Sequence, residues 1–347
     1  MGKQSKILSM WREHCPDGVD LLLRELVFRT VCCHRQGPKP NILLFAIRRS
    51  GTTMMLNTVA SHPGLRYVGR PFHTALISRF RRQIPDLATA AGHPGGRPGF
   101  SFIHFEGEAE RQFRQFAKKV ISAQIHIYPS LDFFQPYFQR VTDRVIFQMT
   151  NETALIEWFN DQFDAPIFLL LRHPIPTGIS VIKDGWRPNC EDFLNHEWFV
   201  QTHLAGPQVD LARRILDAGS PLAIEVLDWT LKMLLPIRAV HSGRHANWLV
   251  LTYEQAVLEP ENVVHALSES LDLPQEEPML QQIRRASATA SPSSARKVGD
   301  PDFQIKRWRK NVPPQQEREL MSIPAAFGID VYHAGQLTAA KGFTSIG

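Results

Sequence analysis

The amino-acid sequence predicts an α/β protein with a three-layer α/β/α arrangement, in which helices cover both faces of a central parallel sheet. Short apolar runs alternate along the chain with segments of helical periodicity, which is the pattern of βαβ units. The runs are apolar at almost every position, as in strands that are buried on both faces of a parallel sheet. The 347 residues are 43% hydrophobic and 10% aromatic, which provides ample material for a core.

Six runs are predicted to be the strands of this sheet. They are 41–47, 65–69, 120–128, 144–150, 165–172 and 247–253. The predicted helices between and after them are 52–61, 106–119, 153–163, 177–184, 208–242 and 261–271. Loops are predicted at 88–100, which is rich in Gly and Pro, and at 286–303, which is rich in small polar residues. Because strand-like runs continue between these loops, we expect one domain over 39–347, preceded by a helical extension over 1–38.

Composition favours a cytoplasmic protein that handles anions. The formal net charge of +5, from 39 basic and 34 acidic residues, is too mild to indicate a nucleic-acid partner. The four cysteines, Cys15, Cys32, Cys33 and Cys190, have no zinc-site spacing and are expected to be free thiols, and no metal is expected. No apolar run approaches the ~20 residues of a membrane helix. The amphipathic run 20–31 is expected to pack onto the domain, with weak contact to a membrane surface as the alternative.

The first predicted strand leads into a phosphate-binding type of loop, "RRSGTT", at Arg48–Thr53. A buried strand, a tight turn and a helix N-terminus together form a site for an anion, because backbone N–H groups and the helix dipole face the ligand. Gly51 lets the backbone approach the anion closely, and Arg49 supplies a permanent charge whose planar fork can hold two oxygens. Thr52 and Thr53 can cap the helix and donate hydroxyl groups.

This loop differs from the one that binds ATP or GTP, whose pattern is G-x-x-x-x-G-K-[ST]. Thr52 follows Gly51 where that pattern has lysine, and Ala46 replaces its first glycine. ATP is therefore disfavoured as the ligand.

"RRSGTTMML" resembles the 5′-phosphosulfate loop of the sulfotransferases, [KR]-[ST]-G-[ST]-[TS] followed by an apolar helix. The resemblance extends over roughly 41–320. It implies a fold like that of P-loop nucleotide-binding proteins, with 39–347 as a single sulfotransferase-like domain. It also implies transfer of a sulfuryl group from the co-substrate 3′-phosphoadenosine 5′-phosphosulfate (PAPS) to a hydroxyl or amine, without a metal. The implied residues around the 5′-phosphate are Arg48, Arg49, Ser50, Gly51, Thr52 and Thr53.

"RHPIPTGIS", residues 172–180, resembles the family's 3′-phosphate element, an arginine followed by Pro and, eight residues later, serine. The resemblance implies that Arg172 and Ser180 bind the 3′-phosphate. His173 stands where Asp or Asn is usual. Tyr253 follows a strand that resembles the family's Y-E-[DE]-L strand, and lies either near the adenine or in the core. The C-terminal segment resembles the family's closing segment. The resemblance implies that Arg296, Lys297 and Gly299 fold over the 3′-phosphate. It also implies that Trp308 and Arg309 anchor this segment to the domain.

The residue at the position of the family's usual general base departs from the family pattern. Arg70 replaces the glutamate of the usual G-E-P-F, and a guanidinium cannot act as a base. His73 is the first candidate and His126 the second, with His104 and Glu106 as further options. Alternatively, the protein has lost activity, or Arg70 binds an acidic acceptor. The expected catalytic residues are therefore Arg49 with His73 or His126.

A PAPS-dependent sulfotransferase is the favoured interpretation. The alternatives are a P-loop kinase-like enzyme, which needs ATP and magnesium, and a homologue that binds PAPS or its product without catalysis. The acceptor is expected to be a hydroxyl-bearing glycan, lipid, peptide or small molecule, because no short motif specifies it.

Overall fold

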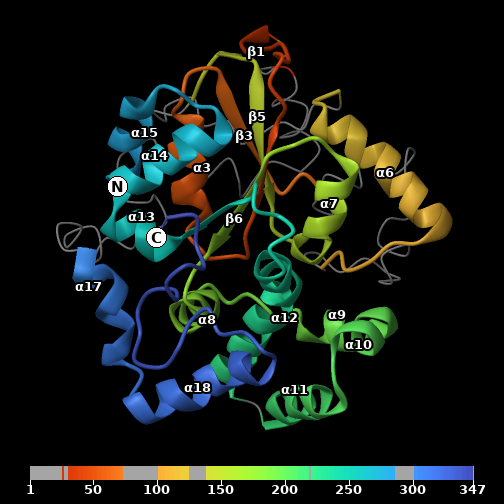
Figure 1. Cartoon of the computed structure of the whole chain (residues 1–347), viewed down its shortest axis with the longest axis vertical. Coiled ribbons are helices and arrows are strands. Elements are labelled where there is room, and N and C mark those ends of the chain that lie inside the picture. The colour runs from red at the N-terminus through yellow and green to blue at the C-terminus, as the bar shows by residue number, and fades with distance from the viewer. Residues whose placement is uncertain are drawn as a thin grey trace.

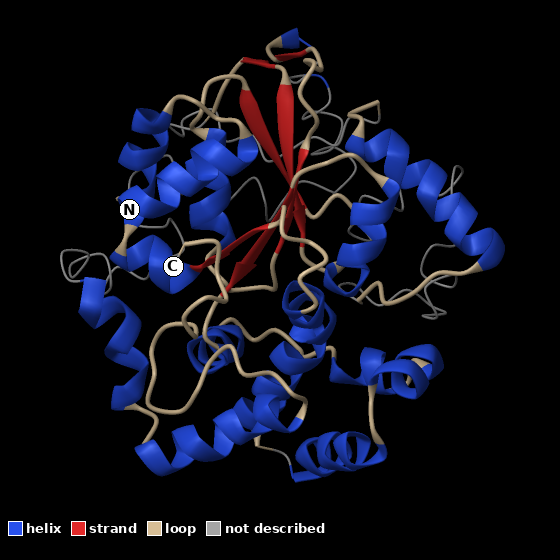
Figure 2. Cartoon of the chain, in the orientation of Figure 1, coloured by secondary structure: helices blue, strands red, loops and turns tan. Residues whose placement is uncertain are grey.

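The computed structural model describes residues 26, 30–72, 101–124, 138–218, 220–285 and 301–346. Five parallel strands form its central sheet, in the order β3-β5-β2-β6-β7 (Figures 1 and 2). In chain order they are β2 (Ile42–Phe45), β3 (Leu65–Gly69), β5 (Arg144–Met149), β6 (Ile167–Leu171) and β7 (Leu249–Thr252). The predicted α/β fold with a central parallel sheet is confirmed.

β2 lies in the middle of the sheet because both its edges are paired. Phe45 is opposite Met149 of β5 and opposite Leu169 of β6. All four residues of β2 are fully buried, as expected for a central strand covered on both faces. The carboxyl ends of β5, β2 and β6 consequently meet at one edge of the sheet.

Alternate residues of β2 point to opposite faces, which gives the protein two apolar cores. Leu43 and Phe45 belong to one core and Ile42 and Leu44 to the other. The helices of the first core include α6 (Gly107–Ile121), α7 (Ile156–Gln162) and α12 (Pro221–His241), and those of the second include α3 (Thr52–Ala60), α14 (Pro260–Leu271) and α15 (Glu276–Ile283). Figure 1 shows α3, α14 and α15 on one side of the sheet and α6 and α7 on the other. These are the three predicted layers.

The remaining elements complete the edges of the domain. They are β1 (Cys33–His34), β4 (Val141–Thr142), η1 (Thr153–Leu155), α8 (Pro174–Lys183), α9 (Cys190–Leu194), α10 (Glu197–His203), α11 (Gly206–Ala218), α13 (Tyr253–Leu258), α17 (Pro301–Lys306), η2 (Arg307–Lys310) and α18 (Pro314–Ala326). β1 pairs with β4, so the last residues of the expected N-terminal extension join the domain. Among the helices of the described residues, none combines the length and apolar character needed to cross a membrane.

Five of the six predicted strands are present, and the sixth prediction is wrong at its start. The segment predicted as a strand at 120–128 begins inside α6, which continues to Ile121 because Phe113, Phe116 and Val120 are spaced to bury one helical face. Residues 125–128 lie outside the described residues. The helix predicted over 208–242 is two helices, α11 and α12. Ser220 has extended backbone before Pro221, and a residue before proline is driven out of helical conformation.

Two of the predicted loops fall largely outside the description. The segment 88–100 is not described, and of 286–303 only residues 301–303 are, where they begin α17. Most of 20–31 also lies outside it. Cys32, Cys33 and Cys190 are free thiols, as expected.

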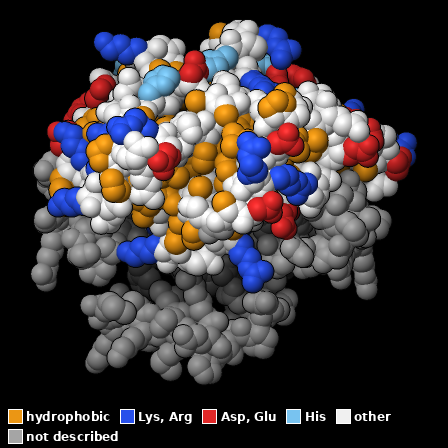
Figure 3. Space-filling view, turned by 90° about the horizontal axis from the view of Figure 1, so that it is seen from below, with side chains coloured by type: hydrophobic (Ala, Val, Ile, Leu, Met, Phe, Trp, Pro, Cys, Tyr) orange, Lys and Arg blue, Asp and Glu red, His pale blue; other side chains and the backbone are white. Residues whose placement is uncertain are grey.

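The end of the molecule that lies lowest in Figure 1 carries charges of both signs. In Figure 3, apolar side chains gather near the centre of this face, with basic and acidic groups around them. Among the residues drawn in colour, this view shows no single-sign basic surface of the kind that holds a phosphate backbone.

Candidate functional site

A cavity of about 510 Å³ opens at the carboxyl edge of the sheet. In open α/β sheets this edge is where ligands bind. The described residues that line the cavity include no Asp, Glu or His, but they include seven arginines: Arg48, Arg49, Arg70, Arg172, Arg284, Arg285 and Arg307. Carboxylates outside the lining pair with two of these arginines, Asp184 with Arg49 and Glu261 with Arg284. The remaining array of permanent cations is suited to a ligand with several negative charges.

The loop between β2 and α3 forms the floor of this cavity. Arg49 (φ 67°) and Gly51 (φ 89°) both have left-handed backbone conformation, which turns the chain sharply into the helix. Gly51 is the N-cap of α3, and no side chain caps the helix there. The first N–H groups of α3 are therefore not satisfied by a capping side chain, and Thr52 and Thr53 line the cavity beside them.

Gly51 also permits a close contact with Tyr253. A Cβ atom at position 51 would lie 2.5 Å from Cδ2 of the Tyr253 ring, which no real Cβ tolerates. The tyrosine ring thus packs directly on the backbone of the loop.

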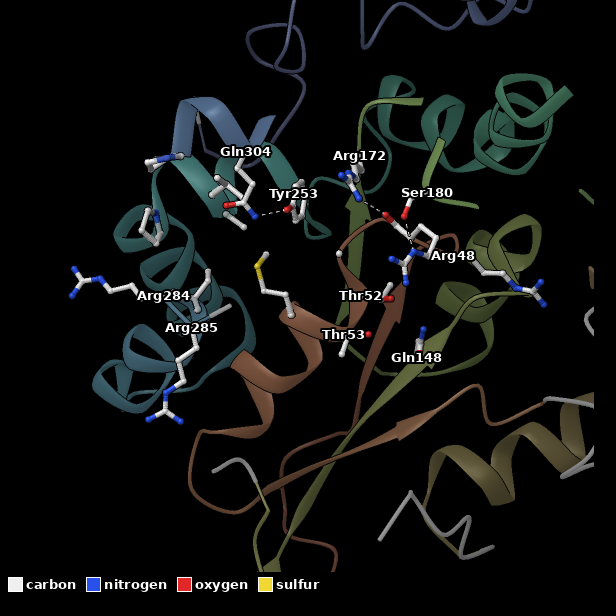
Figure 4. A pocket seen from close by; sticks show the side chains of 18 of the residues that line it. Arg48, Thr52, Thr53, Gln148, Arg172, Ser180, Tyr253, Arg284, Arg285 and Gln304 are labelled. Atoms are coloured by element: carbon white, nitrogen blue, oxygen red, sulfur yellow. Dashed lines mark hydrogen bonds between the residues drawn. The ribbon is translucent and has the colours of Figure 1, made fainter. Parts of the chain in front are cut away.

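Arg49 connects this loop to helix α8. Its Nε donates a hydrogen bond to Oγ of Ser180 at 2.8 Å, and its Nη1 lies 3.1 Å from Oδ2 of Asp184. In return, Nη1 of Arg172 donates to the backbone carbonyl of Arg49 at 2.8 Å. The two segments that the sequence marks as anion-binding elements are therefore in direct contact (Figure 4).

Arg172 is held from several directions. Its backbone carbonyl accepts a hydrogen bond from Nε1 of Trp229 at 3.0 Å, and its guanidinium lies 4.3 Å above the centre of the Tyr253 ring. The hydroxyl of Tyr253 accepts from Nε2 of Gln304 at 2.7 Å. Nε of Arg172 is buried and has no hydrogen-bond partner among the described residues, so it retains a donor for a ligand.

The ring of His173 caps the start of helix α8. Its Nδ1 accepts a hydrogen bond from the N–H of Ile175 at 3.3 Å at the start of α8. Burial, followed by the charges of Arg309 and Arg172, lowers the pKa of His173 to about 3, so the imidazole remains neutral. An uncharged ring nitrogen is an acceptor, as an Asp or Asn oxygen is.

The backbone of His173 is fixed by a buried carboxyl group. Its N–H donates to Oε1 of Glu254 at 3.0 Å, and the Tyr332 hydroxyl donates to Oε2 of the same residue at 3.0 Å. Burial raises the pKa of Glu254, although the hydrogen bond from His173 acts in the opposite direction. Glu254 and Tyr332 thereby fix the backbone next to Arg172.

The structure brings most of the predicted binding residues to the cavity. Those that line it are Arg48, Arg49, Gly51, Thr52, Thr53, Arg172, Ser180 and Tyr253. Ser50 is an exception, because it is fully buried and does not line the cavity. The predicted His73, His126, Arg296, Lys297 and Gly299 lie outside the described residues.

The other predicted residues take structural positions. His104 stacks on the Trp198 ring at 3.9 Å, and neither His104 nor Glu106 lines the cavity. Trp308 is buried against His173, with ring centres 5.0 Å apart, and Arg309 donates to Oε1 of Glu317 at 2.7 Å. The described residues contain no group of His, Cys, Asp and Glu that could hold a metal ion.

Several residues of the cavity were not identified from the sequence. Gln148 is the single residue of β5 that is not buried, and it is the only uncharged polar residue in that strand. Polar residues at the end of an otherwise apolar strand could have indicated that Gln148, and Thr150 just after the strand, belong to the cavity. Arg284, Arg285 and Arg307 carry no comparable pattern, because basic residues after a helix are usually part of a solvated surface.

Comparison with known proteins gives distant structural similarity only. No family model matches the chain, and no curated protein matches it. Among solved structures, one match is titled "Sulfotransferase Domain from the Curacin Biosynthetic Pathway", with 15% identity, a TM-score of 0.40 and coverage of 85% of this chain and 99% of that one. Another is "Sulfotransferase Domain from the Synechococcus PCC 7002 Olefin Synthase", with 17% identity, a TM-score of 0.38 and coverage of 86% and 98%. At these identities and TM-scores, neither match assigns a donor, an acceptor or a catalytic residue to this chain.

Replacing Gly51 by alanine should destabilise the protein more than the same change at Gly243. Both residues have positive φ, but a Cβ at position 243 would have no atom within 4 Å, whereas one at position 51 would collide with Tyr253. Gly243→Ala should cost about 1–2 kcal/mol for backbone strain alone, and Gly51→Ala should cost clearly more. The urea midpoints of the two variants measure the difference. Equal losses would mean that the loop can move away from Tyr253.

The free energy of unfolding should decrease as the pH falls, and protonation of His173 should account for part of this decrease. Because its folded pKa, about 3, lies below the unfolded value of about 6.5, the unfolded chain binds a proton first. The stability that the neutral ring provides is complete above about pH 6.5 and is lost as the pH falls toward 3, at about 1.4 kcal/mol per pH unit. Unfolding free energies between pH 4 and 6 should therefore fall less steeply for His173→Asn, which removes the titrating ring and keeps an acceptor. Identical slopes would contradict a neutral buried imidazole.

Proposed function

We propose that the protein binds PAPS and transfers its sulfuryl group to an acceptor hydroxyl. One observation carries the proposal: two separate anion-binding elements, at the ends of the neighbouring strands β2 and β6, are joined through Arg49. The first offers the N-terminus of α3 with Thr52 and Thr53, and the second offers Arg172 and Ser180. A nucleotide that carries phosphates on both its 5′ and 3′ positions matches two such elements, whereas ATP has a single chain of phosphates.

In this proposal each element binds one phosphate of the donor. The first N–H groups of α3, with Thr53 and Arg49, hold the 5′-phosphate, and Arg172 with Ser180 holds the 3′-phosphate. Tyr253, which lines the cavity, is the proposed neighbour of the adenine. The pattern lacks the lysine of an ATP-binding loop, and the resemblance to sulfotransferases implies chemistry without a metal.

Catalysis would then consist of positioning and charge stabilisation. The acceptor oxygen forms a bond to sulfur, while the bond between sulfur and the 5′-phosphate oxygen breaks and its electron pair passes to that phosphate. Arg49 and the α3 N–H groups stabilise the negative charge that develops on the departing phosphate. A base takes the proton of the acceptor hydroxyl.

His73 remains the predicted general base, and His126 remains the second candidate. Because the described lining residues contain no carboxylate or imidazole, the part of the cavity wall that the structure describes supplies no base. The same observation favours a second candidate function, a protein that binds PAPS or its product 3′-phosphoadenosine 5′-phosphate (PAP) without catalysis.

PAP should stabilise the protein against heat, and ATP with magnesium should not. A ligand at a hundredfold excess over its Kd adds about 2.7 kcal/mol, which raises the melting temperature of a domain of this size by several degrees. Differential scanning fluorimetry with each nucleotide at equal concentration tests this. A larger shift with ATP and magnesium would favour the kinase-like alternative.

Arg172→Ala should weaken PAP binding much more than binding of adenosine 5′-monophosphate. The two nucleotides differ only in the 3′-phosphate, so losses that are common to both report on the loop and on adenine contacts. Losing a hydrogen bond to a charged group costs about 1.5–3 kcal/mol, or roughly ten- to a hundredfold in affinity. Isothermal titration of both ligands into both proteins gives the contrast. Equal losses would show that Arg172 does not contact the 3′-phosphate.

His73→Ala should abolish sulfuryl transfer while it leaves PAP affinity within a few-fold. Removing a general base typically lowers the rate by ~10²–10⁴-fold, and it does not remove donor contacts. His126→Ala is the matched variant, and transfer from labelled PAPS to a panel of hydroxyl acceptors is the assay. Loss of activity in His126→Ala alone would move the assignment to that residue. Tight PAPS binding with no transfer by the unmutated protein would favour the non-catalytic alternative.

A further inference from the structure

The order of the strands divides the cavity into two sides. β6 and β7 lie on one side of the β2 loop and bring Arg172, Ser180 and Tyr253 to the cavity. β5 and β3 lie on the other side and end next to Gln148, Thr150 and Arg70. The steps of the proposed function use only the first side, although the resemblance implied that Arg48 lies near the 5′-phosphate. Figure 4 shows Gln148 and Arg48 on the other side of Thr52 and Thr53 from Arg284 and Arg285.

Arg48 and Arg70, which we call the arginine pair, both lie on this second side of the cavity. Both line the cavity, and Arg70 is close enough for its charge, after burial itself, to lower the pKa of the Arg48 guanidinium. Arg48 lies 4.5 Å above the ring of Trp186, a contact that orients the guanidinium without neutralising it. Within the described residues, neither guanidinium makes a hydrogen bond or an ion pair with a carboxylate.

The acidic residues near the pair do not supply a full counter-charge. Burial raises the pKa of Glu152, near Arg70, to about 8 and that of Glu225, near Arg48, to about 7. Asp228 is engaged by Nζ of Lys232 at 2.5 Å. Two partly buried guanidinium groups that line the same side of a cavity repel each other, and an anion bound between them offsets this cost.

Neutral hydrogen-bonding groups complete the second side. Thr150 is only 3% exposed, yet it lines the cavity, and its hydroxyl has no hydrogen-bond partner among the described residues. Gln148 offers an amide beside it. A buried hydroxyl without a partner is uncommon in folded proteins and indicates a group that a ligand satisfies.

We infer that the arginine pair, with Thr150 and Gln148, is an additional anion-binding subsite, separate from the two elements for the donor, that holds an acidic group of the acceptor. The substrate class is a hydroxyl compound that itself carries a carboxylate, sulfate or phosphate group. The assignment to the acceptor rests on the proposed function, which places the donor on the opposite side of the cavity. Binding of an anion by the arginine pair does not depend on the proposed function.

Arginine labelling with phenylglyoxal and mass spectrometry tests the subsite without a known acceptor. The protein is saturated with PAP, and sodium sulfate is compared with sodium chloride at equal ionic strength. PAP alone should slow the labelling of Arg49 and Arg172 but not that of Arg70. Sulfate should then slow the labelling of Arg48 and Arg70 about tenfold, as for a charged hydrogen bond, and leave that of the exposed, cavity-lining Arg285 unchanged.

A matched pair of glycosides then tests the acceptor assignment. 4-Nitrophenyl β-D-glucuronide and 4-nitrophenyl β-D-glucoside differ by a carboxylate in place of a hydroxymethyl group. The glucuronide should protect Arg70 and the glucoside should not. Arg70→Gln should abolish protection of Arg48 by the glucuronide, whereas Arg285→Gln, which removes the same charge from the opposite side, should retain it.

Three results would overturn the inference. Labelling of Arg70 at the same rate with and without sulfate would show that the pair binds no anion. Protection of Arg70 by PAP or PAPS as strong as that of Arg49 would assign the pair to the donor or its sulfuryl group. Equal effects of the two glycosides would remove the acidic acceptor. If PAP protects no arginine, the proposed function fails, and the effect of sulfate on Arg70 still decides the subsite.

Discussion

Arg49 connects the loop after β2 to the helix after β6, and the geometry of the cavity depends on this connection. Its guanidinium reaches Ser180 and Asp184, while its carbonyl accepts from Arg172. The residue achieves this with a left-handed backbone, which costs a non-glycine residue of order 1 kcal/mol. Three polar contacts from α8 and the end of β6 offset that cost, so the strained loop and the second anion element stabilise one another.

The packing behind Arg172 explains how a histidine can stand at the N-terminus of helix α8. A histidine at position 173 would be a poor choice if it were exposed and charged, because a cation at a helix N-terminus opposes the dipole. Burial between Trp308 and Tyr332, with Arg309 and Arg172 nearby, keeps the ring neutral and makes it an acceptor. The C-terminal segments therefore act on the cavity indirectly, through the protonation state of a capping residue.

Local patterns account for what the sequence predicted well. An apolar run marks a strand, and Gly51 after two arginines marks a loop, because the physical requirements lie within a few residues of each other. Arg48, Arg70, Gln148 and Thr150 line one cavity because β5 lies next to β2, and strand order follows from packing over the whole chain. The error at 120–128 has a similar origin, since Val120 and Ile121 fit an apolar strand as well as the buried face of α6.

Asp184 forms an ion pair with the arginine that the proposed function assigns to the 5′-phosphate. The carboxylate lies 3.1 Å from the Arg49 guanidinium, and both side chains are only about a quarter to a third exposed. In the proposed function, a phosphate at Arg49 would compete with this carboxylate for the guanidinium. A doubly charged phosphate with several acceptor oxygens makes stronger charge-assisted hydrogen bonds than a singly charged ion does. The ion pair would then favour strongly coordinating anions over simple salts at this loop.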